Sequence, residues 1–166
     1  MSAPTEQELK DLAEKLGVCM KDKGVKLASA ESCTGGWLAK IITDIPGSSE
    51  WFTGSVVCYS NESKMSLLGV KENTLTDFGA VSSDTVIEMV DGLFEHTNAD
   101  VAVGISGIAG PDGGSDDKPV GLVWLSWGKR EKSVYTKSYN FEGGREDVRK
   151  QSIAQILNNL LDLQVC

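Results

Sequence analysis

The short run Val101-Ala102-Val103-Gly104-Ile105 constrains the fold most, because it is nearly all apolar and separates two very different segments. Before it, apolar side chains recur at helical spacing behind a capping serine at Ser82 or Ser83. The apolar positions of that helix are Val86, Met89, Val90, Leu93 and Phe94. After the run, residues 107–118 are rich in Gly and Asp and predict a loop. This arrangement is typical of a buried central strand.

The rest of the chain alternates between helical and extended patterns. Helices are expected over residues 5–22, after Ser32, behind an N-cap at Asn61, and from about Arg145 onward. Strands are expected over residues 25–28 and 51–59, with a hairpin formed by residues 120–127 and 133–139. This order predicts an α/β fold, a single three-layer α/β/α domain with a mixed sheet over residues 1–166.

The charge of the chain argues against one class of partner. The formal net charge is −8, and the longest basic cluster is the short stretch Lys129-Arg130-Glu131-Lys132. Proteins that bind nucleic acid normally present a basic face, so we expect no nucleic-acid partner. A small phosphorylated ligand is compatible with the charge, because a few N–H donors at a helix N-terminus can hold one phosphate.

The cysteines and the histidine indicate the compartment of the protein and whether it binds a metal. Cys19, Cys33, Cys58 and Cys166 show no CxxC spacing, and we find neither a signal peptide nor a membrane-spanning stretch. We therefore expect free thiols in the cytoplasm and no membrane partner. Transition-metal sites usually draw on several His or Cys side chains. Because His96 is the only histidine, we expect no protein-bound metal.

Ser32 is a candidate nucleophile, because it lies where a strand gives way to a helix, with Gly35 and Gly36 in the first turn. Such a place offers unpaired backbone N–H groups that favour negative charge, on an oxyanion or on a phosphate. The alternative is that Ser32 only caps the helix. From the spacing alone, capping is the more frequent role.

A serine nucleophile needs a base, and the sequence offers two. His96 lies near the end of a surface-type helix, which favours an ordinary exposed histidine. Lys64 is the alternative, because it falls in the first turn of a helix, where the helix dipole disfavours a cation and burial would lower its pKa further. A solvated surface lysine is the other interpretation of Lys64, and it is the usual one for lysines. Tyr59 could relay a proton or hold the pair in register. Cys33 is expected to pack inward, because neighbouring helical residues point about 100 degrees apart.

Two further segments carry polar groups that could bind a ligand. The loop from Ser106 to Gly114 would bring backbone amides to a strand end, where ligands of open α/β sheets often bind. A flexible surface turn would look the same. Arg145 and Arg149 are four residues apart and share a helix face. They could grip a phosphate or pair with Glu142 and Glu146.

Taken together, these segments resemble the CinA C-terminal domain family, and within it most closely the stand-alone nicotinamide mononucleotide amidases. The likeness runs over nearly the whole chain. It is carried by AESCTGG at 30–36, PGSS at 46–49, Tyr-Ser-Asn-x-x-Lys at 59–64, LGV at 68–70, SGIAGPDGG at 106–114, KPVG at 118–121, and Phe-x-Gly-x-Arg at 141–145 with Arg149. Several separate motifs in one order are highly specific.

The resemblance implies hydrolysis of the carboxamide of nicotinamide mononucleotide to nicotinic acid mononucleotide and ammonia, in pyridine nucleotide recycling, without a cofactor. The family's catalytic serine, tyrosine and lysine match Ser32, Tyr59 and Lys64. The family's nucleotide pocket transfers to Thr34, Gly35, Gly36, Ser48, Ser106, Gly107, Ala109, Gly110 and Arg145. Family habit further implies a homodimer. A non-catalytic nucleotide-binding homologue and a Ser-Lys amidase for a different amide remain as alternatives.

Overall fold

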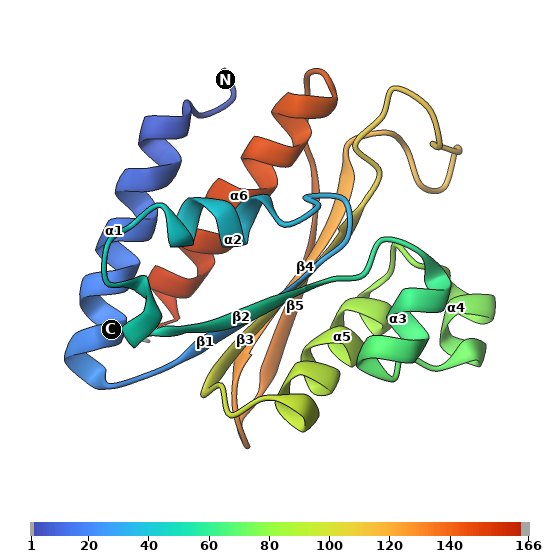
Figure 1. Ribbon diagram of the computed structural model, residues 1–166. Coiled ribbons are helices and arrows are strands. Elements are labelled where there is room, and N and C mark those ends of the chain that lie inside the picture. Colours follow the sequence, from blue (N-terminus) through green and yellow to red (C-terminus); the bar gives the residue numbers. More distant parts are fainter. Residues whose placement is uncertain (1, 164–166) are drawn as a thin grey trace.

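A computed structural model describes residues 2–163 of the protein, in which a five-stranded sheet lies between two layers of helices (Figure 1). The strands are β1 (Leu27–Glu31), β2 (Phe52–Val57), β3 (Val101–Gly107), β4 (Leu122–Lys129) and β5 (Val134–Asn140). The helices are α1 (Glu6–Lys23), α2 (Trp37–Thr43), the short 3-10 helix η1 (Ser48–Glu50), α3 (Asn61–Leu68), α4 (Glu72–Phe78), α5 (Ser83–His96) and α6 (Arg145–Asp162).

The sheet has the strand order β2-β1-β3-β4-β5 and is mixed. β1 pairs in parallel with β2 and with β3, whereas β3, β4 and β5 pair in antiparallel fashion. The run that begins at Val101 therefore forms the central strand, with its side chains buried from Val101 to Ser106. The predicted hairpin is β4 and β5. The predicted α/β class and mixed sheet are confirmed.

The two faces of the sheet carry separate hydrophobic clusters. On one face, α2 and α6 pack against alternate strand residues, which include Leu27, Val103 and Leu125, and α1 packs on α2 and α6. On the other face, α5 packs directly on the sheet and α3 and α4 pack on α5, so that the sheet is the middle layer (Figure 1). The small residues Ala28 and Ala102 face this second cluster. They let α5 approach the sheet closely, since small side chains reduce the distance between layers.

Two local expectations were wrong, and one helix was missed. α2 begins only at Trp37, after a turn of four residues, and not directly after Ser32. The N-cap of α3 is Ser60, whose hydroxyl accepts from the backbone of Ser63, so that Asn61 is the first helical residue. The helix α4 was not predicted at all. Its seven residues are too few for a distinct helical periodicity.

The cysteines depart from the expectation of free thiols at one position. Cys33 and Cys58 are free and buried. Cys19, on α1, is disulfide-bonded, and Cys166 lies outside the described residues. The spacing of cysteines in a sequence does not report which thiols the fold brings together. Among the described residues, no helix is long and apolar enough to cross a membrane.

The parallel pairing of β1, β2 and β3 positions the site. Their carboxyl ends lie at the same edge of the sheet, because Glu31 is opposite both Val57 and Ile105. The residues that follow each strand must therefore converge there. Ser32 follows β1, Tyr59 lies just beyond β2, and Ser106 is near the end of β3. Ligands of open α/β sheets bind at this edge.

Candidate active site

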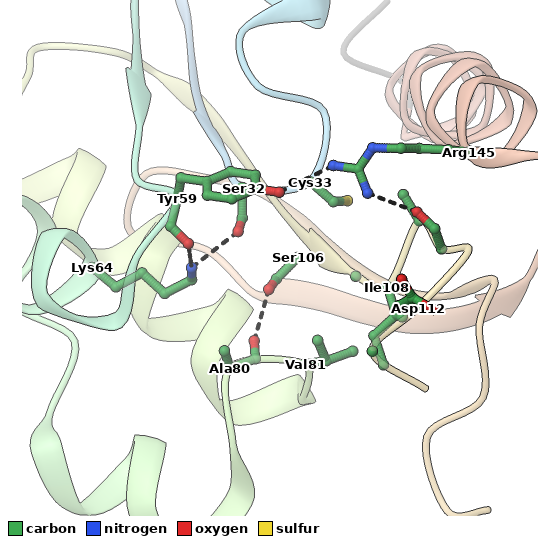
Figure 2. Close-up of a pocket in the computed structure, with 14 residues that line it drawn as sticks. Ser32, Cys33, Tyr59, Lys64, Ala80, Val81, Ser106, Ile108, Asp112 and Arg145 are labelled. Atoms are coloured by element: carbon green, nitrogen blue, oxygen red, sulfur yellow. Dashed lines mark hydrogen bonds between the residues drawn. The ribbon is translucent and has the colours of Figure 1, made fainter. Parts of the chain in front are cut away.

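A cavity of about 260 Å³ opens at the carboxyl edge of β1 and β3. It collects residues from five parts of the chain that are far apart in the sequence (Figure 2). The lining residues are Ser32, Cys33, Tyr59, Lys64, Ala80, Val81, Ser106, Gly107, Ile108, Ala109, Gly110, Asp112, Gly113 and Arg145. Eight of the predicted site residues line this cavity: Ser32, Tyr59, Lys64, Ser106, Gly107, Ala109, Gly110 and Arg145.

Ser32 and Lys64 are in direct contact at the bottom of the cavity. Lys64 Nζ lies 3.0 Å from Ser32 Oγ, within hydrogen-bond distance. The two residues are 7% and 1% exposed, respectively. Ser32 is also fixed by its backbone, because its N–H donates to the Ile105 carbonyl at the end of β3. The distance thus satisfies the first geometric requirement for a nucleophile and its base.

The other two neighbours of Lys64 Nζ are main-chain carbonyls. Nζ lies 2.9 Å from the Cys58 oxygen. It lies 3.2 Å from the Tyr59 oxygen, a contact that Figure 2 shows. A neutral amine has two N–H groups and one lone pair. If the two N–H groups donate to the two carbonyls, the lone pair faces the Ser32 hydroxyl. In that arrangement the two carbonyls just beyond β2 hold the amine and leave the Ser32 hydroxyl as its third neighbour.

The burial of Lys64 moves its protonation equilibrium toward the neutral amine. Burial lowers the pKa of Lys64, because removal from water disfavours the charged form. The salt bridges among residues 2–163 do not include Lys64, so no carboxylate in direct contact opposes this effect. A lysine with a lowered pKa can act as a general base at moderate pH.

Tyr59 uses its two polar groups in different directions. Its carbonyl faces Lys64, whereas its hydroxyl accepts from Arg145 Nη2 at 3.1 Å. The side chain is 62% exposed at the cavity mouth. Figure 2 shows the ring extending from Lys64 toward Arg145. Among residues 2–163, the Tyr59 hydroxyl makes no hydrogen bond to Ser32 or Lys64. The contact between Ser32 and Lys64 is direct.

Cys33 lines the cavity but is poorly suited to be a nucleophile. It is buried and belongs to the hydrophobic cluster beneath α2 and α6, which confirms the prediction that it packs inward. Burial raises the pKa of its thiol to about 12. Because the thiolate is the nucleophilic form, such a thiol is unreactive near neutral pH.

The segment from Ser32 to Gly36, which we call the nucleophile turn, differs from the expected helix N-terminus. The first free N–H groups of α2 do not face the cavity, because the buried Glu31 carboxylate accepts from Leu38 N and Ala39 N. Thr34 donates to the same carboxylate. Gly35 and Gly36 have φ values of 60° and 92°, in the left-handed region that favours glycine. These glycines shape the turn, and the cavity lining does not include them or Thr34.

The opposite side of the cavity is formed by the loop after β3. At Gly110 this loop is tied to α6, because Arg145 Nη1 donates to the Gly110 carbonyl at 2.8 Å. The Ser106 hydroxyl donates to the Ala80 carbonyl at 2.7 Å, which links β3 to the segment between α4 and α5. Ser48 does not join the cavity lining. It lies in η1, which precedes β2, at the opposite edge of the sheet.

Several lining residues were not predicted. Ile108, Asp112 and Gly113 belong to the glycine-rich loop from Ser106 to Gly114, which the sequence had already indicated as a possible ligand-binding segment. Asp112 could have been recognised there, because it is the only charged residue that this loop contributes to the cavity lining. Ala80 and Val81 carried no signal, because the segment between α4 and α5 becomes recognisable only once α4 is known. Residues 2–163 contain no group of three His, Cys, Asp or Glu side chains that could hold a metal ion.

Comparison with known proteins identifies the family of this chain. The model of the CinA C-terminal domain matches residues 9–164. The nicotinamide-nucleotide amidohydrolase PncC of Escherichia coli strain K12 is 49% identical over 156 residues, which cover 94% of each chain. PncC of Pseudomonas putida is 46% identical over 152 residues, covering 92% of this chain and 94% of the relative.

A solved structure agrees as well. The competence/damage inducible protein CihA from Agrobacterium tumefaciens superposes with a TM-score of 0.92 at 37% identity, and 98% of each chain is covered. The fold, the family model and the long matches to curated relatives all lead to one assignment. The chain belongs to the CinA C-terminal domain family and, like the hydrolases it resembles, is an enzyme.

Proposed function

We propose that this enzyme hydrolyses the carboxamide of nicotinamide mononucleotide, giving nicotinic acid mononucleotide and ammonia. The observation that carries the proposal is the 3.0 Å contact between buried Ser32 and buried Lys64, in a chain 49% identical to a nicotinamide-nucleotide amidohydrolase. An amidase needs an activated nucleophile, and a serine beside a neutral lysine supplies one.

In the first half of the reaction, the Lys64 lone pair accepts the Ser32 proton as Oγ attacks the carboxamide carbon. The tetrahedral oxyanion needs N–H donors. Cys33 is a candidate, because it lines the cavity and its N–H group makes no backbone hydrogen bond among residues 2–163. Each donor contributes roughly 3–4 kcal/mol in a comparable site. Lys64 then gives its proton to the leaving nitrogen, so that ammonia departs and an ester to Ser32 remains.

In the second half, water attacks the ester carbon and Lys64 accepts one of its protons. When the C–O bond to Ser32 breaks, Lys64 returns this proton to Oγ, and the carboxylic acid is released. Tyr59 contributes to this cycle through its carbonyl, which holds one Lys64 N–H, and its hydroxyl braces Arg145. The direct contact supports proton transfer without a relay through the Tyr59 hydroxyl.

The charges at the mouth of the cavity suit this substrate. The nucleotide carries an anionic phosphate and a cationic pyridinium ring. Arg145 is an exposed cation at the mouth, whereas Asp112 is the one carboxylate in the cavity lining. The pyridinium charge would also disfavour protonation of Lys64 and so keep the base neutral. The place of the reaction in pyridine nucleotide recycling and the homodimer stay predictions.

The test is ammonia release from nicotinamide mononucleotide, nicotinamide riboside and nicotinamide, assayed side by side. We expect turnover of the mononucleotide by the wild type and loss of at least a thousandfold in Ser32→Ala. Preferred turnover of another amide would replace the substrate but keep the chemistry. Binding of the mononucleotide without any ammonia release would mean a non-catalytic homologue.

A further inference from the structure

The nucleophile turn is held from one side by a buried carboxylate that the reaction itself does not use. Glu31, the last residue of β1, is 0% exposed and lies next to Ser32. Its Oε1 accepts from Thr34 Oγ1 at 2.7 Å and from Leu38 N at 2.9 Å. Its Oε2 accepts from Ala39 N and from Ser55 Oγ, both at 3.1 Å. Four donors meet the two oxygens, which suits a carboxylate that only accepts.

The same turn is held from the other side by an arginine. Arg149 Nε donates to the Cys33 carbonyl and Nη2 to the Thr34 carbonyl, each at 3.0 Å. The guanidinium also lies 4.9 Å from the ring centroid of Trp37, the first residue of α2. Arg149 does not line the cavity, unlike Arg145 one helical turn earlier. Its planar fork thus connects α6 to two successive carbonyls directly after the nucleophile.

These contacts matter for the reaction because Ser32 and Lys64 come from different elements. Lys64 lies on α3, which packs on α5 on one side of the sheet, whereas Arg149 lies on α6 on the other side. The position of Ser32 Oγ relative to Nζ therefore depends on how the turn is fixed. A misplacement of about 1 Å in a catalytic geometry can lower the rate about a hundredfold.

We propose that Glu31 and Arg149 are positioning residues that hold the nucleophile turn so that the Ser32 hydroxyl faces Lys64. Glu31 holds the Thr34 hydroxyl and the N–H groups of Leu38 and Ala39. Arg149 holds the carbonyls of Cys33 and Thr34. A buried carboxylate costs stability compared with an apolar side chain, so its presence beside the nucleophile has a functional explanation. The kinetic part of this inference rests on the proposed function, and the geometric part does not.

Glu31→Gln is the sharpest substitution, because it keeps the shape of the side chain. One carboxylate oxygen is replaced by an NH2 group, which cannot accept the hydrogen bonds that a backbone N–H and a hydroxyl donate to that oxygen in the wild type. We expect kcat to fall about a hundredfold with KM within threefold of the wild type. The matched control is Glu88→Gln, because Glu88 also accepts from one backbone N–H and one hydroxyl, those of Lys71 and Thr74, outside the cavity lining.

Arg149→Lys keeps the charge but removes the fork, since an ammonium cannot bridge two carbonyls in the same way. We expect kcat to fall about tenfold with little change in KM. Arg130→Lys is its matched control. Arg130 donates to the carbonyls of Phe94, Thr97 and Ala99 and lies 5.1 Å from the Phe94 ring centroid, outside the cavity lining. Both controls should keep the wild-type kcat, whatever their melting temperature.

Crystal structures of Glu31→Gln and Arg149→Lys give a readout that does not depend on the substrate. We expect the distance from Ser32 Oγ to Lys64 Nζ to exceed 3.5 Å in both. An unchanged 3.0 Å distance, or a kcat loss equal to that of the controls, would overturn the inference. If the wild type releases no ammonia, the proposed function fails and the distances alone decide. If Glu31→Gln does not fold, the Arg149→Lys and Arg130→Lys pair decides.

Discussion

The two walls of the cavity differ in burial and in the chemical role that their side chains can have. The inner wall is the pair Ser32 and Lys64, which are almost completely removed from water. The outer wall consists of Tyr59, Asp112 and Arg145, all exposed at the mouth. Burial lowers the pKa of Lys64, whereas the exposed charges stay hydrated. We infer that the inner wall carries the chemistry and the outer wall carries recognition, and this division predicts different kinetic signatures.

Replacement of the inner base should have the largest effect. In Lys64→Met, we expect kcat to fall about a thousandfold, because general-base catalysis is worth roughly 10²–10⁴. Steady-state ammonia release would measure it, with circular dichroism to verify folding. Lys21→Met, which removes a lysine paired with Glu50 away from the cavity, is the control and should be fully active. A Lys64→Met variant with a tenth of the wild-type kcat would contradict the assignment of the base.

The pH profile tests the same wall without a substitution. Lys64 must be neutral to accept the Ser32 proton, and burial lowers its pKa. The rate constant kcat/KM should therefore rise about tenfold per pH unit and then level off below the ordinary lysine value of about 10.4. A profile measured from pH 5 to 11 would show this. A rate that falls with rising pH across this range would exclude a neutral lysine as the base.

Substitution in the outer wall should change binding more than turnover. In Arg145→Gln, the charge at the mouth and the bonds to Gly110 and Tyr59 are lost. We expect KM to rise about tenfold, because one charge-assisted hydrogen bond contributes about this factor to binding. The value of kcat should stay within threefold of the wild type. Initial rates over a range of nucleotide concentrations separate the two constants. A large loss of kcat at unchanged KM would place Arg145 with the chemistry.

The smallest effect is expected at Tyr59, the residue of the outer wall whose carbonyl contacts Lys64. Tyr59→Phe removes only the hydroxyl, and the carbonyl that contacts Lys64 remains. We expect kcat to fall less than threefold and KM to rise slightly, through the lost contact with Arg145. The same kinetic assay measures this. A loss of about a hundredfold in kcat would instead favour a proton relay through the hydroxyl.

Much of this architecture could be predicted from the sequence. The apolar run at β3, the periodicity of α5 and the hairpin are local patterns, and all three formed as expected. The start of α2 could not be predicted in this way. It depends on Glu31, whose carboxylate binds N–H groups of α2 and the Ser55 hydroxyl of a neighbouring strand. A contact of this kind depends on tertiary packing, so no local pattern reports it.

The candidate site shows the same division. The sequence by itself determined the order of the elements and which serine, lysine and tyrosine could act together. Only the tertiary structure decided that Ser32 meets Lys64, 32 residues away, and that the Tyr59 hydroxyl turns toward Arg145. It also distinguished Arg145 from Arg149. They share a helix face, but Arg145 contacts the Gly110 carbonyl and Arg149 contacts the Cys33 carbonyl. The reason is physical: periodicity depends on neighbours along the chain, whereas burial and side-chain pairing depend on which elements pack together.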